Sequence, residues 1–310
     1  EIMLQQTRVE AVKPYYERFL KALPDVAALA ACPEDQLMKL WEGLGYYSRV
    51  RNLHRAAVLL CEEYGGELPA DYDRLLALPG VGEYTAGAVA SIAFGLPIPA
   101  VDGNVLRVAA RLDNDFTPIT DAKFKKQTRE RFAALMPSDR PGDLNQSLME
   151  LGATVCLPNG APRCADCPIQ HLCEGFHRGN AAVLPLRAAK KARRVENRTV
   201  LVVRCGQLVG LRQRPKKGLL AGLWELPSLD GHLSPDELRA ALTEMGWSVR
   251  KLLSLRPAKH IFTHVEWHMN GVYVELDAPA PALTFVTPAE LRDAYALPSA
   301  FRSFVSVLED

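Results

Sequence analysis

Four cysteines crowd one short stretch of the chain in the pattern C-x7-C-x2-C-x5-C, at Cys156, Cys164, Cys167 and Cys173. A disulfide framework is disfavoured because the chain is long and its total of seven cysteines is odd. Four thiolates this close together suit a tetrahedral metal centre, either zinc or an iron–sulfur cluster. The spacing leaves both metals open. The other three cysteines stand alone in apolar stretches and are expected in the core.

A glycine-rich turn lies between two helical patterns, in the run Leu78-Pro-Gly-Val-Gly-Glu-Tyr-Thr-Ala86. Without Cβ atoms, its backbone can approach a phosphate closely and offer amide groups at a helix N-terminus. The alternative is a turn that only links two packed helices. The full run favours binding of DNA phosphates, with the candidate residues Leu78, Gly80, Val81, Gly82 and Thr85.

One short stretch carries the positive excess of a chain whose net charge is only +1. Residues 187–198 hold six Lys or Arg side chains against a single Glu. Such a stretch is either a solvated linker or a strap that contacts nucleic-acid phosphates. Both interpretations stay open, because charge balance alone does not require a nucleic-acid partner.

Helical periodicity positions these groups in the first part of the chain. Val9, Val12, Tyr16, Phe19 and Leu20 recur at spacings of three and four, which predicts an amphipathic helix over residues 8–22. Similar stripes predict helices at about 36–42, 50–63, 71–77, 84–94, 103–112, 121–134 and 143–155. Asp102 is placed to cap the helix over 103–112. We expect an all-α domain over residues 1–178.

In the second part of the chain, apolar residues recur at shorter spacings, as they do in strands. Strands are predicted at 199–205 and 207–214, joined near Gly206, and at 271–276. Ser234 and the Pro and acids after it predict the start of a helix that ends near residue 245. A last helical stretch is predicted over 287–308. A smaller α+β domain over 199–310 should therefore follow a basic linker at 179–198.

Length and composition limit the class of protein. The 310 residues exceed what one core usually holds, and 48% apolar with 24% charged residues is typical of soluble globular chains. No apolar stretch reaches the roughly 18–20 residues of a membrane span. Glu1 opens directly into a helical pattern, so no secretory signal is expected. We expect a cytoplasmic protein, bacterial by default, or a nuclear or mitochondrial one if the source is eukaryotic.

Several motifs together resemble a known superfamily. The run 78–82, the segment Val101-Asp-Gly-Asn-Val-Leu-Arg107 and the four cysteines resemble the helix-hairpin-helix DNA glycosylases with an iron–sulfur loop. The segments 1–8 and 41–49 further resemble the MutY-type adenine DNA glycosylases, and the match covers nearly the whole chain. The resemblance implies a helix-hairpin-helix at about 71–95, a [4Fe–4S] cluster on the loop 156–173 and a Nudix-like second domain.

The resemblance also implies a catalytic pair. Breaking an N-glycosidic bond needs a proton for the leaving base and a negative charge near the oxocarbenium-like sugar. Glu1 corresponds to the acid that protonates adenine at N7, and Asp102 to the carboxylate that stabilises the sugar cation. Asn104 and Tyr84 correspond to residues that orient them. Sister enzymes carry a lysine at the Tyr84 position, and a phenol cannot form their Schiff base.

Contacts to the rest of the DNA follow from the same resemblance. Gln5, Gln6 and Tyr46 correspond to residues that wedge into the base stack, and Arg49 is a further DNA-binding candidate. For Tyr46, packing in the core is the alternative.

The second domain should read the base opposite the flipped adenine. Residues 215–227 and 234–246 resemble a Nudix fold, but Ala240 and Thr243 replace two glutamates of its magnesium site, which argues against hydrolysis. Within the loop 260–264, the resemblance implies that Phe262 intercalates while Thr263 and His264 bind 8-oxoguanine.

We therefore expect a monomeric, hydrolytic adenine DNA glycosylase that acts on duplex DNA with adenine opposite 8-oxoguanine or guanine, without a membrane partner. A bifunctional pyrimidine-lesion glycosylase and lyase of the endonuclease III type is the first alternative. A lesion-binding module without catalysis is the second, and a Nudix pyrophosphatase is a weaker third.

Overall fold

The computed structural model describes residues 1–187 and 192–308. The chain divides into two compact units, and the division does not follow the predicted boundary near residue 178. One unit combines Glu1–Gln5 with Asn52–Lys190, and the other combines Gln6–Arg51 with Lys191–Asp310. Residues 188–191, within the predicted linker 179–198, lie outside the described residues. No helix in the described parts of the chain is long and apolar enough to cross a bilayer.

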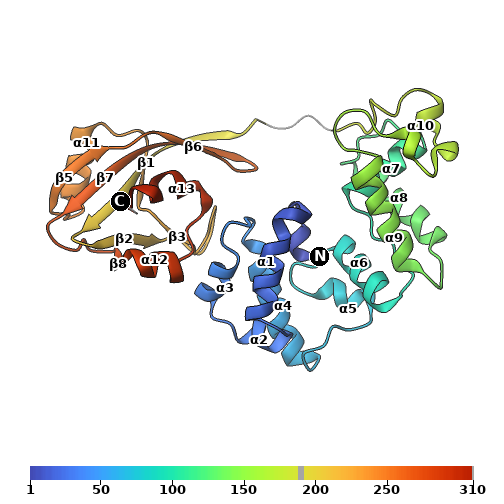
Figure 1. Ribbon diagram of the computed structural model, residues 1–310, viewed down its shortest axis with the longest axis horizontal. Coiled ribbons are helices and arrows are strands. Elements are labelled where there is room, and N and C mark those ends of the chain that lie inside the picture. The colour runs from blue at the N-terminus through green and yellow to red at the C-terminus, as the bar shows by residue number, and fades with distance from the viewer. Residues whose placement is uncertain (188–191, 309–310) are drawn as a thin grey trace. The chain divides into compact units, whose positions relative to one another are not determined.

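The first unit is helical (Figure 1). It holds the short turn η1 (Ile2–Leu4), the end of α4 (Ser48–Glu63), α5 (Tyr72–Ala77), α6 (Glu83–Phe94), α7 (Gly103–Leu112), α8 (Ala122–Leu135), α9 (Pro141–Glu150), η2 (Leu151–Val155), η3 (Cys164–Asp166), η4 (Gln170–Leu172) and α10 (Glu174–His177). The predicted helix over 143–155 ends differently, because its last turn, η2, is a π-helix. The other predicted helices of this unit are confirmed to within a few residues.

The core of this unit forms around α7. Val105, Val108 and Ala109 pack with Phe124 and Phe132 of α8, all almost fully buried. The predicted N-cap is confirmed, since the Asp102 carboxylate accepts a hydrogen bond of 2.8 Å from the backbone N–H of Val105. The cap and the apolar face together fix where α7 begins and how it is rotated, which orients the residues of its first turn.

The second unit combines helices with one large sheet. Its helices are α1 (Val9–Ala22), α2 (Val26–Ala31), α3 (Glu34–Leu40), the start of α4, α11 (Pro235–Glu244), α12 (Pro288–Ala294), η5 (Ser299–Phe301), α13 (Arg302–Val305) and η6 (Ser306–Leu308). The strands are β1 (Arg194–Cys205), β2 (Leu208–Gln213), β3 (Trp224–Glu225), β4 (Ser228–Asp230), β5 (Val249–Ser254), β6 (Ala258–Ile261), β7 (Val265–Leu276) and β8 (Thr284–Val286).

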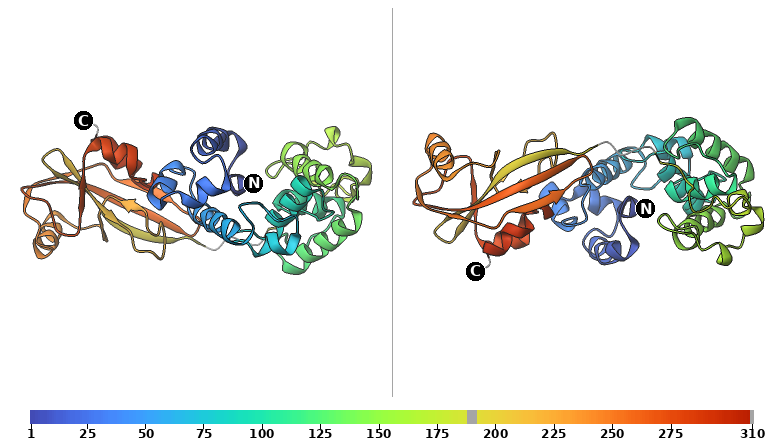
Figure 2. Two further views of the ribbon diagram at one scale, coloured as in Figure 1. Left: turned by 90° about the horizontal axis from the view of Figure 1, so that it is seen from below. Right: turned by 90° about the horizontal axis from the view of Figure 1, so that it is seen from above.

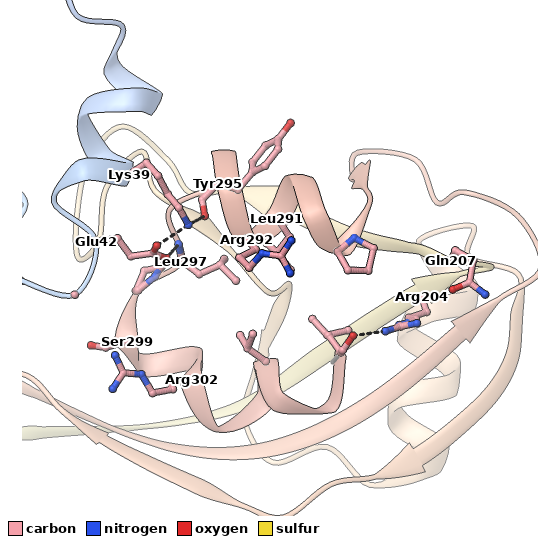
Figure 3. Close-up of a pocket in the computed structure, with 15 residues that line it drawn as sticks. Lys39, Glu42, Arg204, Gln207, Leu291, Arg292, Tyr295, Leu297, Ser299 and Arg302 are labelled. Carbon is pink, nitrogen blue, oxygen red and sulfur yellow. Dashed lines mark hydrogen bonds and ion pairs between the residues drawn. The ribbon is translucent and has the colours of Figure 1, made fainter. Parts of the chain in front are cut away.

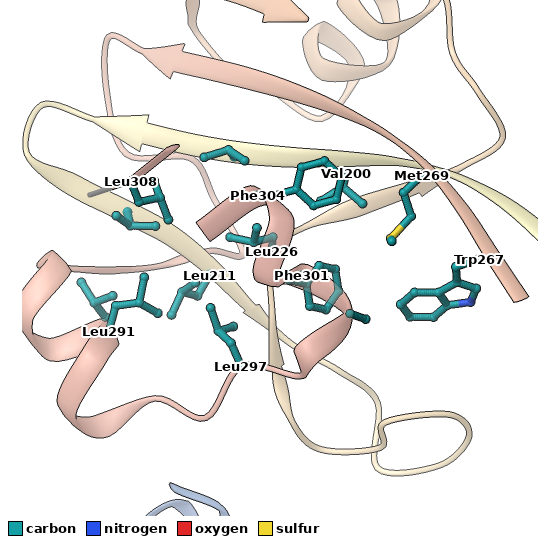
Figure 4. Packing of buried hydrophobic residues seen from close by; sticks show 14 residues of the cluster. Val200, Leu211, Leu226, Trp267, Met269, Leu291, Leu297, Phe301, Phe304 and Leu308 are labelled. Carbon is teal, nitrogen blue, oxygen red and sulfur yellow. The ribbon is translucent and has the colours of Figure 1, made fainter. Parts of the chain in front are cut away.

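The sheet has the order β3-β2-β1-β7-β5, with β4 on β1, β6 on β7 and β8 on β2. Its centre is the parallel pair β1 and β7, which run side by side over their length (Figure 2). Side chains alternate between two faces. Val200 and Val202 pack into a cluster with α12 and α13 (Figure 4), whereas Leu201 and Val203 pack under α11.

The structure departs from the predicted strands and helices in this unit. β1 begins at Arg194, inside the predicted linker, because residues 194–198 pair with β7. β7 likewise begins at Val265 rather than near 271, and β3 to β6 and β8 were not predicted. The predicted helical stretch 287–308 is broken after Ala294, where residues 295–298 end in Pro298, which cannot continue a helix hydrogen-bond ladder.

Residues 6–51 pack with the sheet domain through specific bonds. The Lys39 ammonium donates to the Tyr295 carbonyl at 3.1 Å. The Glu42 carboxylate accepts from the backbone N–H of Leu297 at 2.8 Å. These bonds give a physical reason for the division of the chain into its two units.

Candidate functional site

The first turn of α6 places Tyr84 beside Glu1. The Tyr84 hydroxyl donates a hydrogen bond of 2.7 Å to the Glu1 carboxylate and lies 3.3 Å from the Met149 sulfur. Burial raises the pKa of Tyr84 above its ordinary value, and the hydrogen bond and charge of Glu1 raise it further. The phenol therefore stays protonated at neutral pH and remains a donor to the exposed carboxyl group.

Asp102 lies close enough to affect the same phenol. After the contributions of burial and Glu1, its charge adds a smaller upward shift to the Tyr84 pKa. One carboxylate oxygen of Asp102 caps α7, and the other accepts a hydrogen bond of 2.7 Å from the Asn104 side-chain amide. The structure thus brings Glu1, Tyr84, Asp102 and Asn104 together in the first unit, as the resemblance implied.

A buried arginine that sequence reasoning had not assigned supports this group. Arg107 is 3% exposed and donates to the Asn104 side-chain oxygen at 2.8 Å. It also donates to the carbonyls of Gly152 at 2.5 Å and Cys156 at 2.7 Å. Burial lowers its pKa, although the neighbouring Cys156 offsets part of that effect. The signal available in the sequence was a charged side chain on the apolar face of the predicted helix 103–112.

The four cysteines lie on one loop of the same unit. Cys156 follows η2, and the turns η3 and η4 separate the other three. Burial raises the pKa of Cys164, and the charges of Cys173, Cys156 and Cys167 raise it further. In the described residues, no three His, Cys, Asp or Glu side chains are arranged to hold a metal ion.

The donor set nevertheless fits a thiolate-bound centre. The buried Arg111 guanidinium donates to the Cys156 sulfur at 3.1 Å, so a positive charge lies directly beside this sulfur. The same guanidinium group donates to the Leu157 and Leu184 carbonyls, which ties the loop to α7.

The glycine turn between α5 and α6 is built mainly from packed groups. Gly80 has a φ of +77°, and a Cβ atom there would lie 2.5 Å from the Asn52 Cβ. The Leu78 side chain is buried, and the buried Thr85 hydroxyl accepts a hydrogen bond of 3.1 Å from Gln5. The side chains of Leu78 and Thr85 therefore hold the turn, and the Val81 N–H donates within it to the Leu78 carbonyl at 3.1 Å.

A second group of predicted residues gathers in the other unit. Tyr46 is 45% exposed, with a φ of +48°, and its hydroxyl lies 3.3 Å from the Thr263 hydroxyl. The alternative of core packing is thus wrong for Tyr46, whereas Tyr47 is buried. Arg49 is 8% exposed, its guanidinium lies over the Tyr46 and Trp41 rings and it donates to backbone carbonyls, so it supports Tyr46 from within.

The loop 262–264 forms the tip of the β6–β7 hairpin. Thr263 and His264 are exposed, but Phe262 is half-buried, with its ring edge-on to Trp267 at 4.9 Å. Gln6, Tyr46 and these three residues line one pocket of about 630 Å³. Intercalation of Phe262 would require its ring to leave Trp267. Thr263 and His264 can be contacted without such a change.

The Nudix-like helix α11 carries Ala240 and Thr243, and the Thr243 hydroxyl donates to the Arg239 carbonyl. Glu225, which sequence reasoning had not singled out, is 1% exposed and lies between Arg212 at 2.7 Å and Arg214 at 2.5 Å. Its charge is engaged in these two ion pairs. This glutamate therefore has a structural role.

Comparison with known proteins agrees with this fold. Residues 1–135 match the HhH-GPD superfamily of base excision DNA repair proteins, and residues 199–307 match the NUDIX domain. A thermostable thymine-DNA glycosylase aligns at 28% identity and a TM-score of 0.50, over 57% of this chain and 81% of its own. A non-covalent endonuclease III–DNA complex aligns at 28% identity and a TM-score of 0.51, over 57% of this chain and 81% of its own.

The fold and these matches thus define a DNA glycosylase of the HhH-GPD superfamily, followed by a Nudix-like domain. The adenine DNA glycosylases of Mus musculus and Rattus norvegicus are 36% and 34% identical to this chain, over all of it and 70% of their own lengths. The chain belongs to the family of the adenine DNA glycosylases. Glycosylases of the endonuclease III and MutY kind generally contain an iron–sulfur cluster.

Proposed function

We propose that the protein hydrolyses the N-glycosidic bond of adenine mispaired with 8-oxoguanine, or with guanine, in duplex DNA. The hydrogen bond from Tyr84 to Glu1, beside Asp102, carries this proposal. It assembles a proton donor and a second carboxylate at one place, and such a pair meets both needs of glycosidic bond cleavage.

The proposed reaction uses these groups in sequence. Adenine is rotated out of the duplex, which costs a few kcal/mol. Glu1 gives its proton to N7 of adenine, and the electron pair of the breaking bond to the sugar leaves with the base. The Asp102 carboxylate, held by its bonds to Asn104 and to the Val105 amide, stabilises the oxocarbenium ion. Water then adds to the sugar carbon and its proton returns to a carboxylate.

Tyr84 supports hydrolysis without strand cleavage. A lyase step would need an amine to form a Schiff base with the sugar, and Tyr84 offers a phenol whose pKa is raised by burial. The absence of a borohydride-trapped adduct with DNA would agree with this assignment, and a trapped adduct would favour the endonuclease III-like alternative.

We further propose that Cys156, Cys164, Cys167 and Cys173 hold a [4Fe–4S] cluster. When bound, the cluster would supply a rigid cross-link of the loop rather than proton chemistry. Arg111 and Arg107 would hold the Cys156 end of that loop against α7. Broad visible absorption of the purified protein, lost with the iron, would support iron–sulfur; a colourless protein with one zinc ion would contradict it.

The loop 260–264 supports the choice of the opposite base. Thr263 and His264 are exposed beside Tyr46 and can offer polar groups to 8-oxoguanine. Duplex DNA is therefore the proposed partner of both units, and we propose that the protein acts as a monomer.

The proposed acid is tested by Glu1→Gln, which keeps the shape of the side chain but cannot donate the carboxyl proton. Because general acid catalysis contributes roughly 10²–10⁴-fold, single-turnover release of adenine should fall at least about 100-fold. Affinity for the mismatched duplex should stay unchanged. Glu10→Gln, on the exposed face of α1, serves as the control. Release at the normal rate would remove Glu1 from its role.

A further inference from the structure

A second pocket lies in the unit of residues 6–51 and 191–310, between the β1–β2 turn, α12 and α13 (Figure 3). Its volume is about 760 Å³. Ligand sites for small molecules usually measure roughly 300–1,000 Å³. The pocket is therefore large enough for a molecule the size of a nucleotide.

Three arginines from three different elements line this pocket: Arg204 of β1, Arg292 of α12 and Arg302 of α13. Lys39 also lines it but is paired with Glu42 at 2.6 Å. Among the described residues, Arg292 forms an ion pair only with its neighbour Asp293, at 3.2 Å. Both side chains are about 70% exposed or more, so this pair gives little stabilisation. The pocket wall therefore carries excess positive charge.

Two of these guanidinium groups have unused donors. Arg302 makes no ion pair with any described residue. Arg204 donates one hydrogen bond of 2.5 Å to the Leu308 carbonyl, but its buried Nε–H has no hydrogen-bond partner in the described part of the chain. A buried donor without a partner costs free energy, and an anion at this position would remove that cost.

Part of the remaining wall is apolar and includes Leu291, Leu297 and Val305, beside the polar Gln207 and Ser299. A fully ionic ligand would gain nothing from this wall, whereas a ligand with a flat organic body and a phosphate could use both. Guanidinium groups match phosphate oxygens in geometry as well as charge. Duplex DNA offers phosphates only on a wide outer surface and cannot fill a pocket of this size.

The pocket lies on the opposite side of the sheet from the Nudix-like helix. Arg292 and Arg302 belong to the face that packs with α12 and α13, and α11 covers the other face. We propose that this pocket binds a nucleoside phosphate. The proposed site is separate from the adenine site and independent of the missing Nudix glutamates.

Isothermal titration calorimetry of the full chain with thymidine 5′-monophosphate tests this proposal, because a pyrimidine nucleotide avoids the proposed adenine site. We expect saturable binding at one site. Thymidine, which lacks the phosphate, should bind at least about 10-fold more weakly, since it loses charge-assisted hydrogen bonds. Equal affinity for thymidine, or no binding of the nucleotide, would overturn the proposal.

Two exposed arginines provide the variants. Arg302→Glu should weaken binding of the nucleotide at least about 10-fold, and Arg292→Glu should do the same if the first variant misfolds. Arg239→Glu, exposed on α11 across the sheet, is the matched control and should bind normally. If Arg302→Glu instead bound the nucleotide normally and lost affinity for an undamaged duplex, the pocket would be a contact to the DNA backbone and the assignment would be wrong.

Discussion

The hydroxyl of Tyr84 is a positioning group, because it contacts Glu1 rather than the bond that breaks. Tyr84→Phe removes this one bond and preserves the ring. Since a hydrogen bond to a charged group contributes about 1.5–3 kcal/mol, we expect single-turnover release of adenine to fall roughly 10- to 100-fold.

The control for that experiment is Tyr64→Phe. Tyr64 directly follows α4, and its hydroxyl makes no hydrogen bond with any described residue. It should leave the rate unchanged. A Tyr84→Phe enzyme with the normal rate would show that Glu1 needs no such donor.

His260 makes the stability of its unit depend on pH. Burial lowers its pKa below the ordinary value of 6.5. As pH falls through about 6.5, the unfolded chain therefore takes up the proton before the folded protein does, and stability decreases. The midpoint of urea unfolding should fall between pH 7.5 and 5.5, and His260→Gln should reduce that change. An identical pH dependence in the variant would contradict this assignment.

Some of the site could be predicted from local pattern, and some could not. The cap at Asp102 follows from its position before an apolar helical stripe, and the structure confirms it. The contact between Glu1 and Tyr84 joins residues 83 positions apart, and no periodicity carries that information. It was accessible only through the resemblance to a family. The burial of Arg49, in the first turn of α4, was missed because it depends on how the preceding segment folds the Trp41 and Tyr46 rings against the guanidinium.

The hairpin between α5 and α6 depends on two glycines in different ways. Gly80 has a positive φ and faces Asn52, whereas Gly82 has a φ of −96° and no atom within 4 Å of a Cβ position. We expect Gly80→Ala to lower the free energy of unfolding by more than about 1 kcal/mol, from backbone strain and overlap. Gly82→Ala should change it by less than about 0.5 kcal/mol. Urea unfolding followed at 222 nm measures both, and equal effects would contradict this account.

The elements that sequence pattern missed share a physical cause. β3, β4 and β8 have two or three residues each, too few to show alternation. β1 begins in a basic stretch because Arg194 and Val195 pair with residues of β7 some 70 positions later. Strand formation there depends on a distant partner, and local composition gives no sign of it. Helices, whose bonds are local, were predicted far better.

At the scale of the whole molecule, the two compact units carry different spectroscopic reporters. All four tryptophans, at positions 41, 224, 247 and 267, lie in the unit of residues 6–51 and 191–310. The helices α5 to α10 all lie in the other unit. Urea curves from tryptophan fluorescence and from ellipticity at 222 nm should therefore not coincide. Superimposable curves would show that the units unfold as one.

The hydrogen-bond distance between the hydroxyls of Tyr46 and Thr263 has a consequence for selectivity. Where the threonine donates this bond, a ligand that takes its proton must replace the tyrosine oxygen, so the ligand gains only the difference between two bonds of similar strength. An undamaged base that offers no better acceptor gains nothing from the exchange. The hairpin tip of the free protein thus discriminates against any ligand whose acceptor binds Thr263 no more strongly than the Tyr46 hydroxyl does.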